Sequence, residues 1–224
     1  MDHYIALNRD AAAIYSSQFP SMVIDVVPNF APLPEVSKPT LDPRIRSGFV
    51  FAGRLTPEKG IKWLLEHWPS GEPLTIYGDG PLKGLVAAAA NTAHSGISFK
   101  GQIPQADLAK AVARAEALIL PSLWREGKPT VMLEALASGT PVLLSNAVAE
   151  GDLLEAAGAG ITFEAGVSSS SLVHAIDALR AGASGFISRA RHLYESEYSE
   201  QIWLERIGGV YERARTKARL RAIR

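Results

Sequence analysis

Two glutamates stand eight positions apart in the segment PSLWREGKPTVMLEALASGTPVL (121–143), where we expect the chemistry of this chain to lie. Glu126 falls in a loop after a predicted strand, and Glu134 falls in the second turn of a predicted helix that begins near Pro129. Backbone amides at a helix start point out of the helix and, together with its dipole, bind anions. The amides near this start belong to Gly127, Lys128, Thr130 and Val131.

A diphosphate at this helix start would lie between the two carboxylates. The helix dipole would contribute on the order of 1 kcal/mol to its binding. Carboxylates repel phosphates but accept hydrogen bonds from vicinal hydroxyls, so sugars on either side of the diphosphate match the layout, as in a nucleotide sugar. A plainer alternative is that Glu126 caps the helix and Glu134 is solvated, because a bare pair at this spacing often arises by chance.

Two cations precede this segment, in the loop AGRLTPEKG (52–60) between a predicted strand and a predicted helix. Arg54 and Lys59 would neutralise a leaving diphosphate, where negative charge develops when a sugar is transferred. Gly53 and Gly60 serve either close backbone approach and helix packing or only the turn. The alternative is an ordinary surface loop with basic side chains.

A third turn follows a strand in IYGDGPL (76–82), where Asp79 and Gly80 form a turn dipeptide and Pro81 begins the next helix. Taken alone this is a plain turn. The motifs of three other enzyme classes are missing: the G-x-S-x-G nucleophile elbow, the P-loop and the G-x-G-x-x-G dinucleotide fingerprint. Their absence removes the usual support for hydrolase, ATPase and dehydrogenase functions.

Strands and helices alternate through the region that carries these motifs. The predicted strands are 48–53, 73–78, 97–101, 117–122, 141–145 and 161–164. The predicted helices between them are 61–68, 81–93, 104–115, 129–139 and 150–157, with Pro104 in a first turn and Gly139 at a helix end. Apolar strands without alternation indicate an α/β fold, a Rossmann-like parallel sheet with helices on both faces and right-handed crossovers.

Ligands of such sheets bind outside the carboxyl ends of the strands. The loops that follow the predicted strands at this edge are 53–60, 77–81, 101–102 and 122–129. Because all four leave the sheet at the same edge, we expect them to converge on one cleft.

The two ends of the chain have a different character. A strand near 4–8, a helix near 9–19 and a strand from 23 precede a proline-rich connector. Three helices follow residue 167, in the segments SSSLVHAIDALRAG, ISRARHLYESEY and EQIWLERIGGVYERARTKARLRAIR. The last ends in six basic residues with no acid between 213 and 224, which is typical of a solvated helix end or, alternatively, of contact with an anionic membrane or a partner domain.

The composition limits the class of protein. Of 224 residues 47% are hydrophobic and 21% are charged, as in ordinary globular domains. The 23 basic and 23 acidic residues cancel, whereas a nucleic-acid-binding chain is usually basic. Without cysteine there is neither a disulfide framework nor a thiolate metal site, and the five histidines are too scattered for a metal.

The sequence also bears on location. No apolar run approaches the roughly 20 residues needed to span a bilayer. The beginning, MDHYIALNRD, does not have the pattern of a signal peptide. We therefore expect a cytoplasmic protein and leave peripheral membrane contact open.

Four motifs in this order resemble the retaining glycosyltransferases of the GT-B fold, the group 1 family that includes sucrose synthase and many bacterial polysaccharide and glycolipid hexosyltransferases. The motifs are FAGRLTPEKG, LTIYGDGPL, ISFKGQIP and ALILPSLWREGKPTVMLEALASGTPVLLS. The resemblance runs from about residue 26 to residue 163 and is specific because the four motifs keep their order at sensible spacing. It implies the C-terminal, nucleotide-sugar-binding half of the fold.

The resemblance assigns roles to the matching residues. Glu126 matches the first glutamate of the E-x7-E signature, which contacts the donor sugar, and Glu134 matches the second, which binds the ribose. Arg54 and Lys59 match the basic pair that holds the diphosphate, so Glu126, Arg54 and Lys59 are the expected catalytic residues. The expected binding residues are Gly53, Arg54, Lys59, Gly78, Gly101, Glu126, Gly127, Lys128, Pro129, Thr130, Val131 and Glu134.

The resemblance also implies a chemistry. The donor sugar would be a UDP-, GDP- or ADP-hexose, transferred with retention through a same-face displacement in which the leaving phosphate helps the acceptor lose its proton. No metal and no cofactor are expected, because Arg and Lys supply the positive charge. Two rivals stay open: a nucleotide-sugar 2-epimerase on the same fold, and a non-catalytic nucleotide-sugar-binding module.

The sequence departs from the family pattern at two places and lacks most of one domain. Lys128 stands where an aromatic or small residue is usual, and NAVAEGDLL (146–154) lacks the usual Gly-Gly and has Asp152 where Glu is common. The family's N-terminal domain, which carries the acceptor site, is almost wholly absent. We therefore expect the chain to bind donor and to transfer little, because positioning both substrates supplies much of the rate.

The expected organisation has four parts. Residues 1–31 are a remnant of the N-terminal domain with the connector Val27-Pro28-Asn29, 32–47 a proline-rich linker, 48–198 the Rossmann-like domain, and 199–224 a helix that crosses to the missing domain. Exposed apolar side chains on that helix would promote self-association. They are Ile202, Trp203, Ile207 and Tyr211.

Overall fold

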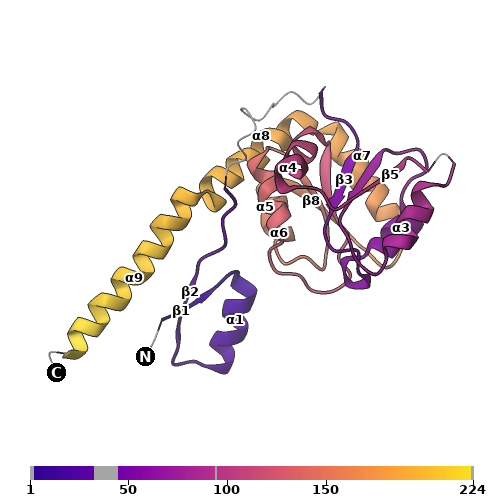
Figure 1. Ribbon diagram of the computed structural model, residues 1–224. Helices are drawn as coiled ribbons and strands as arrows, with labels where there is room; N and C mark the ends of the chain where they lie inside the picture. The colour runs from indigo at the N-terminus through magenta and orange to yellow at the C-terminus, as the bar shows by residue number, and fades with distance from the viewer. Residues whose placement is uncertain (1–2, 33–44, 94, 223–224) are drawn as a thin grey trace.

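The computed structural model describes residues 3–32, 45–93 and 95–222 (Figure 1). A six-stranded parallel sheet lies at the centre of the larger body. Its strands are β3 (Phe49–Ala52), β4 (Leu74–Tyr77), β5 (Ile97–Gly101), β6 (Ala117–Leu120), β7 (Val142–Ser145) and β8 (Gly160–Phe163). Their order across the sheet is β5-β4-β3-β6-β7-β8, so the direction of winding reverses between β3 and β6.

Helices cover both faces of this sheet, which confirms the predicted α/β architecture. They are α2 (Ile61–His67), α3 (Lys83–Ala90), α4 (Gln105–Arg114), α5 (Thr130–Ala137), α6 (Gly151–Ala156), α7 (Ser170–Ala181) and α8 (Ala183–Leu193). Neighbouring residues of β3 belong to opposite cores: Val50 packs with α4, α5 and α8, whereas Phe49 and Phe51 pack with α2 and α7. This alternation is the period-two geometry of a strand buried on both sides.

Helix boundaries differ from the sequence prediction by a few residues. Pro104 and Pro129 are N-caps rather than first-turn residues, because their ψ angles of 145° and 130° keep them extended. The helix predicted over 81–93 is shorter, since Leu82 caps it and Asn91 ends it. Gly139 follows the C-cap Ser138 with φ +68°, the left-handed conformation that stops a helix.

The helix predicted from the segment ISRARHLYESEY begins earlier and changes type. It starts at Ala183, directly after Gly182, and continues beyond Leu193 as the π-helical turn η3 (Tyr194–Tyr198). Tyr194 and Tyr198 are both buried, so this turn belongs to the core and is not a loop. A π-helical turn inside a helix often marks a functional site.

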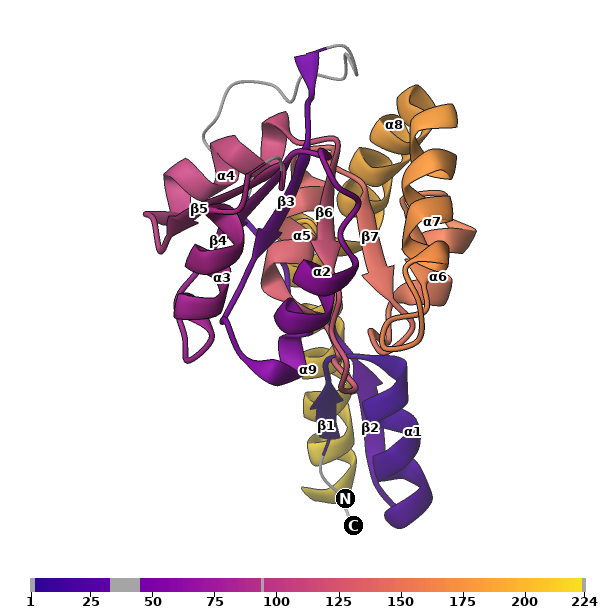
Figure 2. The same ribbon diagram turned by 90° about the vertical axis from the view of Figure 1, so that its right-hand side faces the viewer.

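The beginning and the end of the described chain lie together, apart from the large sheet (Figures 1 and 2). Strands β1 (His3–Ala6) and β2 (Val23–Val26) pair in parallel through the crossover helix α1 (Arg9–Gln18). The long helix α9 (Glu200–Ala222) runs beside this N-terminal unit. Arg213 of α9 forms a 2.6 Å ion pair with Asp25, and the ring of Trp203 lies 5.1 Å from that of Phe30.

Several expectations for the chain ends stay predictions. The four-part organisation has no independent test, and most of the predicted linker, at 33–44, lies outside the described residues. Of the apolar residues expected to promote self-association, Tyr211 is 65% exposed, whereas Ile202, Trp203 and Ile207 are half-buried. In the basic run Arg213 pairs with Asp25 and Arg215 with Glu212, while the side chains after Thr216 lie outside the described part.

Gly60, at the start of α2, gives the first testable prediction. Its φ is +71°, and a Cβ there would lie 1.8 Å from the carbonyl oxygen of Pro121. Gly71 is the matched control, since its φ is +80° and a Cβ there meets nothing within 4 Å. In urea unfolding we expect Gly71→Ala to cost about 1 kcal/mol for the left-handed backbone alone. Gly60→Ala should cost about 1–3 kcal/mol more for overpacking; equal losses would contradict the close approach of these two loops.

Candidate functional site

An open cleft of about 510 Å³ lies at the carboxyl ends of β3, β4 and β5. It is lined by Ala52, Gly53, Arg54, Tyr77, Gly78, Asp79, Gln102, Ile103, Pro104, Gln105 and Leu108. Three of the four loops that the sequence selected, 53–60, 77–81 and 101–102, therefore meet here. The fourth, 122–129, contributes no lining residue and joins the site through the side chains described below.

Gly78 shows how closely these loops approach each other. Its φ is +136°, and a Cβ there would lie 1.9 Å from the carbonyl oxygen of Gly53. The Gly78 amide donates a 2.9 Å hydrogen bond to the carbonyl of Gly101, and the Gly53 amide donates a 3.2 Å bond to the carbonyl of Tyr77. The glycines at 53, 78 and 101 thus join three loops into one cleft wall.

The carboxylate of Glu126 is held from two sides. Lys59 Nζ contacts Oε1, and the hydroxyl of Ser122 donates to Oε2. The predicted pair of Lys59 and Glu126 is therefore brought together although 67 residues separate them. The alternative in which Glu126 caps the helix is not supported, because α5 has no side-chain cap and this carboxylate faces Lys59.

The backbone at Glu126 is held as well. Its amide donates a 3.0 Å hydrogen bond to the carbonyl of Ala147, and its carbonyl accepts a 2.8 Å bond from the amide of Ala149. These bonds form a parallel bridge between Glu126 and Val148. The loop after β6 is thus a paired segment whose position is set by the loop after β7.

Glu134 lies in the second turn of α5, as predicted, and is half-buried. Gln105 Nε2 donates a 2.9 Å hydrogen bond to its Oε1. Burial raises the pKa of Glu134, and the bond from Gln105 partly opposes this rise. Gln105 also lines the cleft, so this hydrogen bond links Glu134 to the cleft wall.

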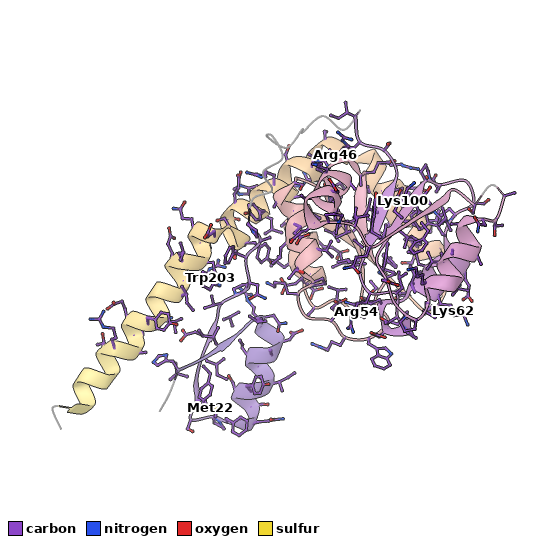
Figure 3. The ribbon with its side chains drawn as sticks, viewed as in Figure 1. Met22, Arg46, Arg54, Lys62, Lys100 and Trp203 are labelled. Atoms are coloured by element: carbon purple, nitrogen blue, oxygen red, sulfur yellow. The ribbon has the colours of Figure 1, made fainter. Side chains whose placement is uncertain are left out.

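Arg54 is the more exposed cation of the predicted pair. Its side chain is 74% exposed and forms a 3.7 Å ion pair with Glu58, four residues on. Such an exposed pair contributes little to stability. Figure 3 shows Arg54 and Arg46 at opposite ends of the α/β body. Arg54 thus lines the cleft with a charge that is available to an anion.

Lys128 does not direct its side chain to the cleft. Its ammonium group is buried, 3.1 Å from Oε1 of Glu150 and 4.4 Å from the centre of the Tyr198 ring. Only the backbone amide of Lys128 is then left for the predicted anion site. Gly127, Thr130 and Val131 keep their predicted places beside Pro129 at the start of α5, and their roles stay predictions.

Sequence reasoning missed Gln105 and Leu108, which line the cleft from the first turn of α4. The sequence did contain a signal that these two residues line the cleft. They lie three positions apart, on one face of the predicted helix, directly after the strand-end loop at 101–102. The role of Gln105 as a partner of Glu134 had no local signal, since 29 residues separate them.

Among the described residues, no three His, Asp or Glu side chains are grouped so that they could hold a metal ion. In the same part of the chain no helix is both long and apolar enough to cross a bilayer. The expectations of metal-independent chemistry, a cytoplasmic location and peripheral membrane contact stay predictions.

Curated proteins of similar sequence are glycosyltransferases. The chain is 36% identical over 100 residues to a putative teichuronic acid biosynthesis glycosyltransferase, TuaC, of Bacillus subtilis. The aligned residues cover 43% of this chain and 24% of that protein. It is 32% identical over 111 residues to a phosphatidyl-myo-inositol mannosyltransferase of Mycobacterium leprae. The aligned residues cover 46% of this chain and 29% of that protein. These matches span less than a third of each relative.

Solved structures share the fold along almost the whole chain. A sucrose-phosphate synthase from Thermosynechococcus elongatus matches with a TM-score of 0.75 at 20% identity, over 94% of this chain and 58% of that one. Anabaena HepE in complex with UDP matches with a TM-score of 0.74 at 18% identity, over 93% of this chain and 63% of that one. At these identities the likeness concerns the fold, that of GT-B glycosyltransferases.

The family itself is identified by the sequence of the α/β body. The match begins at residue 46, just before β3, and ends at residue 181, the last residue of α7. It therefore includes the cleft, both glutamates and both cations, and more than half of the chain. The chain belongs to the family of glycosyl transferases group 1.

Proposed function

We propose that this chain is the nucleotide-sugar-binding domain of a retaining glycosyltransferase that transfers a hexosyl group. The observation that carries the proposal is the contact of Lys59 and Ser122 with the carboxylate of Glu126, close to the strand ends where Arg54 lines an open cleft. Cations, hydroxyl-accepting carboxylates and helix-start amides are the groups that a diphosphate between two sugars requires.

The nucleotide and the hexose would occupy different parts of this site. Glu134, half-buried beside Gln105, would accept hydrogen bonds from the ribose hydroxyls. The amides before Thr130 and the charges of Arg54 and Lys59 would hold the diphosphate. The hexose would then lie against Glu126. No metal is required in this arrangement, because two cations already face the leaving group.

Transfer with retention would proceed on one face of the hexose. The bond from C1 to the diphosphate oxygen breaks, and the acceptor oxygen forms its bond to C1 from the same side. The acceptor proton moves to an oxygen of the leaving phosphate. Arg54 and Lys59 would stabilise the charge that develops on the diphosphate, the kind of electrostatic stabilisation that often contributes most to catalysis.

The N-terminal unit supports the proposal of a second domain that carries the acceptor site. Two parallel strands with one helix are marginal as an independent structure. The unit also exposes large apolar side chains over at least 44% of their surface: Tyr4, Ile5, Leu7, Ile14, Tyr15 and Phe19. Exposed apolar surface of this extent is typical of a contact with further protein. We propose that the rest of an N-terminal α/β domain covers it.

Nucleotide binding can be tested by titration calorimetry with UDP, GDP and ADP; UDP comes first because the HepE structure contains it. We expect one of the three to bind. Glu134→Ala should weaken this binding about tenfold, about 1.4 kcal/mol, because the ribose loses its acceptor. Glu66→Ala, an exposed glutamate of α2, is the control and should bind as wild type. Equal affinity of both variants would contradict the role of Glu134.

Binding of the phosphates by Arg54 can be tested separately from binding of the nucleoside. Arg54→Ala should weaken binding of the nucleoside diphosphate about tenfold and leave binding of the nucleoside unchanged, because only the phosphates contact the guanidinium. Lys62→Ala removes a comparably exposed cation from α2 and should change neither. Loss of nucleoside affinity in Arg54→Ala would show that this residue acts on the base or the ribose instead.

Catalysis by the 224-residue chain should be very weak. We expect no transfer to sugar or lipid acceptors above the level of a Glu126→Ala variant, since effective positioning of both substrates contributes about 7–11 kcal/mol to such reactions. The measurement is product analysis after incubation with each donor sugar. Transfer well above that of Glu126→Ala would show that this chain alone holds both substrates.

A further inference from the structure

A buried polar network lies next to the proposed diphosphate site and has no part in the chemistry described so far. Lys128 and Glu150 form a 3.1 Å ion pair with side chains only 4% and 8% exposed. The hydroxyl of Tyr198 donates a 2.9 Å hydrogen bond to the other oxygen of Glu150, and Lys128 Nζ lies 4.4 Å from the centre of the same tyrosine ring. The three residues come from three separate parts of the chain.

The network extends the backbone pairing at the site. Glu126 and Val148 form a parallel bridge. Two residues further along each segment stand Lys128 and Glu150, whose ion pair lies just beyond the last backbone hydrogen bond between the two segments. The segment 126–129 is therefore held at its beginning by Lys59 and Ser122 and at its end by Glu150.

A buried ion pair is not an efficient means of stabilising a fold. Removing two charges from water is costly, and well-packed neutral residues often replace a buried ion pair at no loss. Burial lowers the pKa of Lys128, although Glu150 opposes this change. Burial also raises the pKa of Tyr198, and the charge of Glu150 adds to the rise, so the hydroxyl stays protonated and donates. What the network does provide is a fixed geometry.

The network also reaches the junction between the two parts of the molecule. Tyr198 ends the π-helical turn η3, directly before α9. At the other end of this turn the hydroxyl of Tyr194 donates a 2.8 Å hydrogen bond to the carbonyl of Ala31, in the connector from the N-terminal unit. The first turn of α9 then places Trp203 against Phe30 of the same connector. Lys128 is thus linked to the connector by two side chains and one short turn.

We propose that Lys128, Glu150 and Tyr198 form a positioning network that fixes the backbone of 126–131 for the diphosphate and couples this segment to the connector at 27–31. The proposal rests on the proposed function, because the segment is the one assigned to the leaving group. Lys128 acts as a positioning residue and not as a ligand, since its ammonium faces Glu150. An aromatic or small residue at 128 would lack this link.

The first test measures the segment without any nucleotide. The double variant Lys128→Met/Glu150→Gln removes both charges and keeps an oxygen that accepts from Tyr198. Its amide hydrogen exchange over 126–131 should be about tenfold faster than in wild type, with a melting temperature within a few degrees. The control Arg180→Met/Glu116→Gln removes the 2.8 Å ion pairs of Arg180 with Glu116 and Glu72 at the amino ends of the strands and should leave exchange over 126–131 unchanged.

Two exchange results would overturn the proposal. Unchanged exchange over 126–131 would show that the network does not hold this segment. Faster exchange throughout the chain, together with a large fall in melting temperature, would show that the network only stabilises the fold. Because this test uses the free protein, its outcome does not depend on whether any nucleotide binds.

The second test uses the nucleoside diphosphate found by calorimetry. The network variant should bind it about tenfold more weakly than wild type, while the Arg180→Met/Glu116→Gln control binds normally. In wild type, binding should slow exchange over 194–203, and this protection should disappear in the network variant. Normal affinity of the network variant would overturn the positioning role. Failure of wild type to bind any of the three nucleotides would instead refute the proposed function, and the exchange test would still decide on the network.

Discussion

Parallel pairing of the six central strands is the constraint on which the site depends. Each strand must return through a helix, so every loop that follows a strand leaves the sheet at the same edge. The strand order reverses between β3 and β6, and the loops after these two strands meet there, joined by a 2.9 Å hydrogen bond from the amide of Leu123 to the carbonyl of Glu58. Lys59 from the first loop and Glu126 from the second meet across this point. A contact between residues so distant in sequence is thus a consequence of topology.

The cations at the site differ in how deeply they are buried. The exposed cation, Arg54, has only a weak neighbour in Glu58, whereas Lys59 already contacts Glu126. Deeper in the fold Lys128 is paired with Glu150 and inaccessible to a ligand. Arg54, Lys59 and Lys128 therefore differ in availability to a ligand because they differ in burial. The composition, with equal numbers of acidic and basic residues, does not predict these differences in burial.

The N-terminal unit and helix α9 join the α/β body at the connector and through a 2.6 Å ion pair between Asp10 of α1 and Arg125 in the loop before α5. Ala31 accepts a hydrogen bond from Tyr194, and Phe30 packs against Trp203, so the connector and the start of α9 are held together. Further along, Arg213 pairs with Asp25 of β2. A displacement of the unit relative to the body would therefore disturb both the connector contacts and the pair of Asp10 with Arg125. The loop before α5 thus contacts the N-terminal unit directly through Arg125, and is linked to the connector through Lys128, Tyr198 and Tyr194.

The sequence by itself determined the strands, the helices and the four strand-end loops, because apolar runs and Pro or Gly signals act locally. It also selected Glu126, Glu134, Arg54 and Lys59, because their spacing matches known motifs. Only the tertiary structure decided where side chains point. Lys128 reads as part of an anion site, yet its ammonium turns to Glu150 and Tyr198, 22 and 70 residues further on. The direction of a side chain depends on partners that folding brings near, and no local pattern contains them.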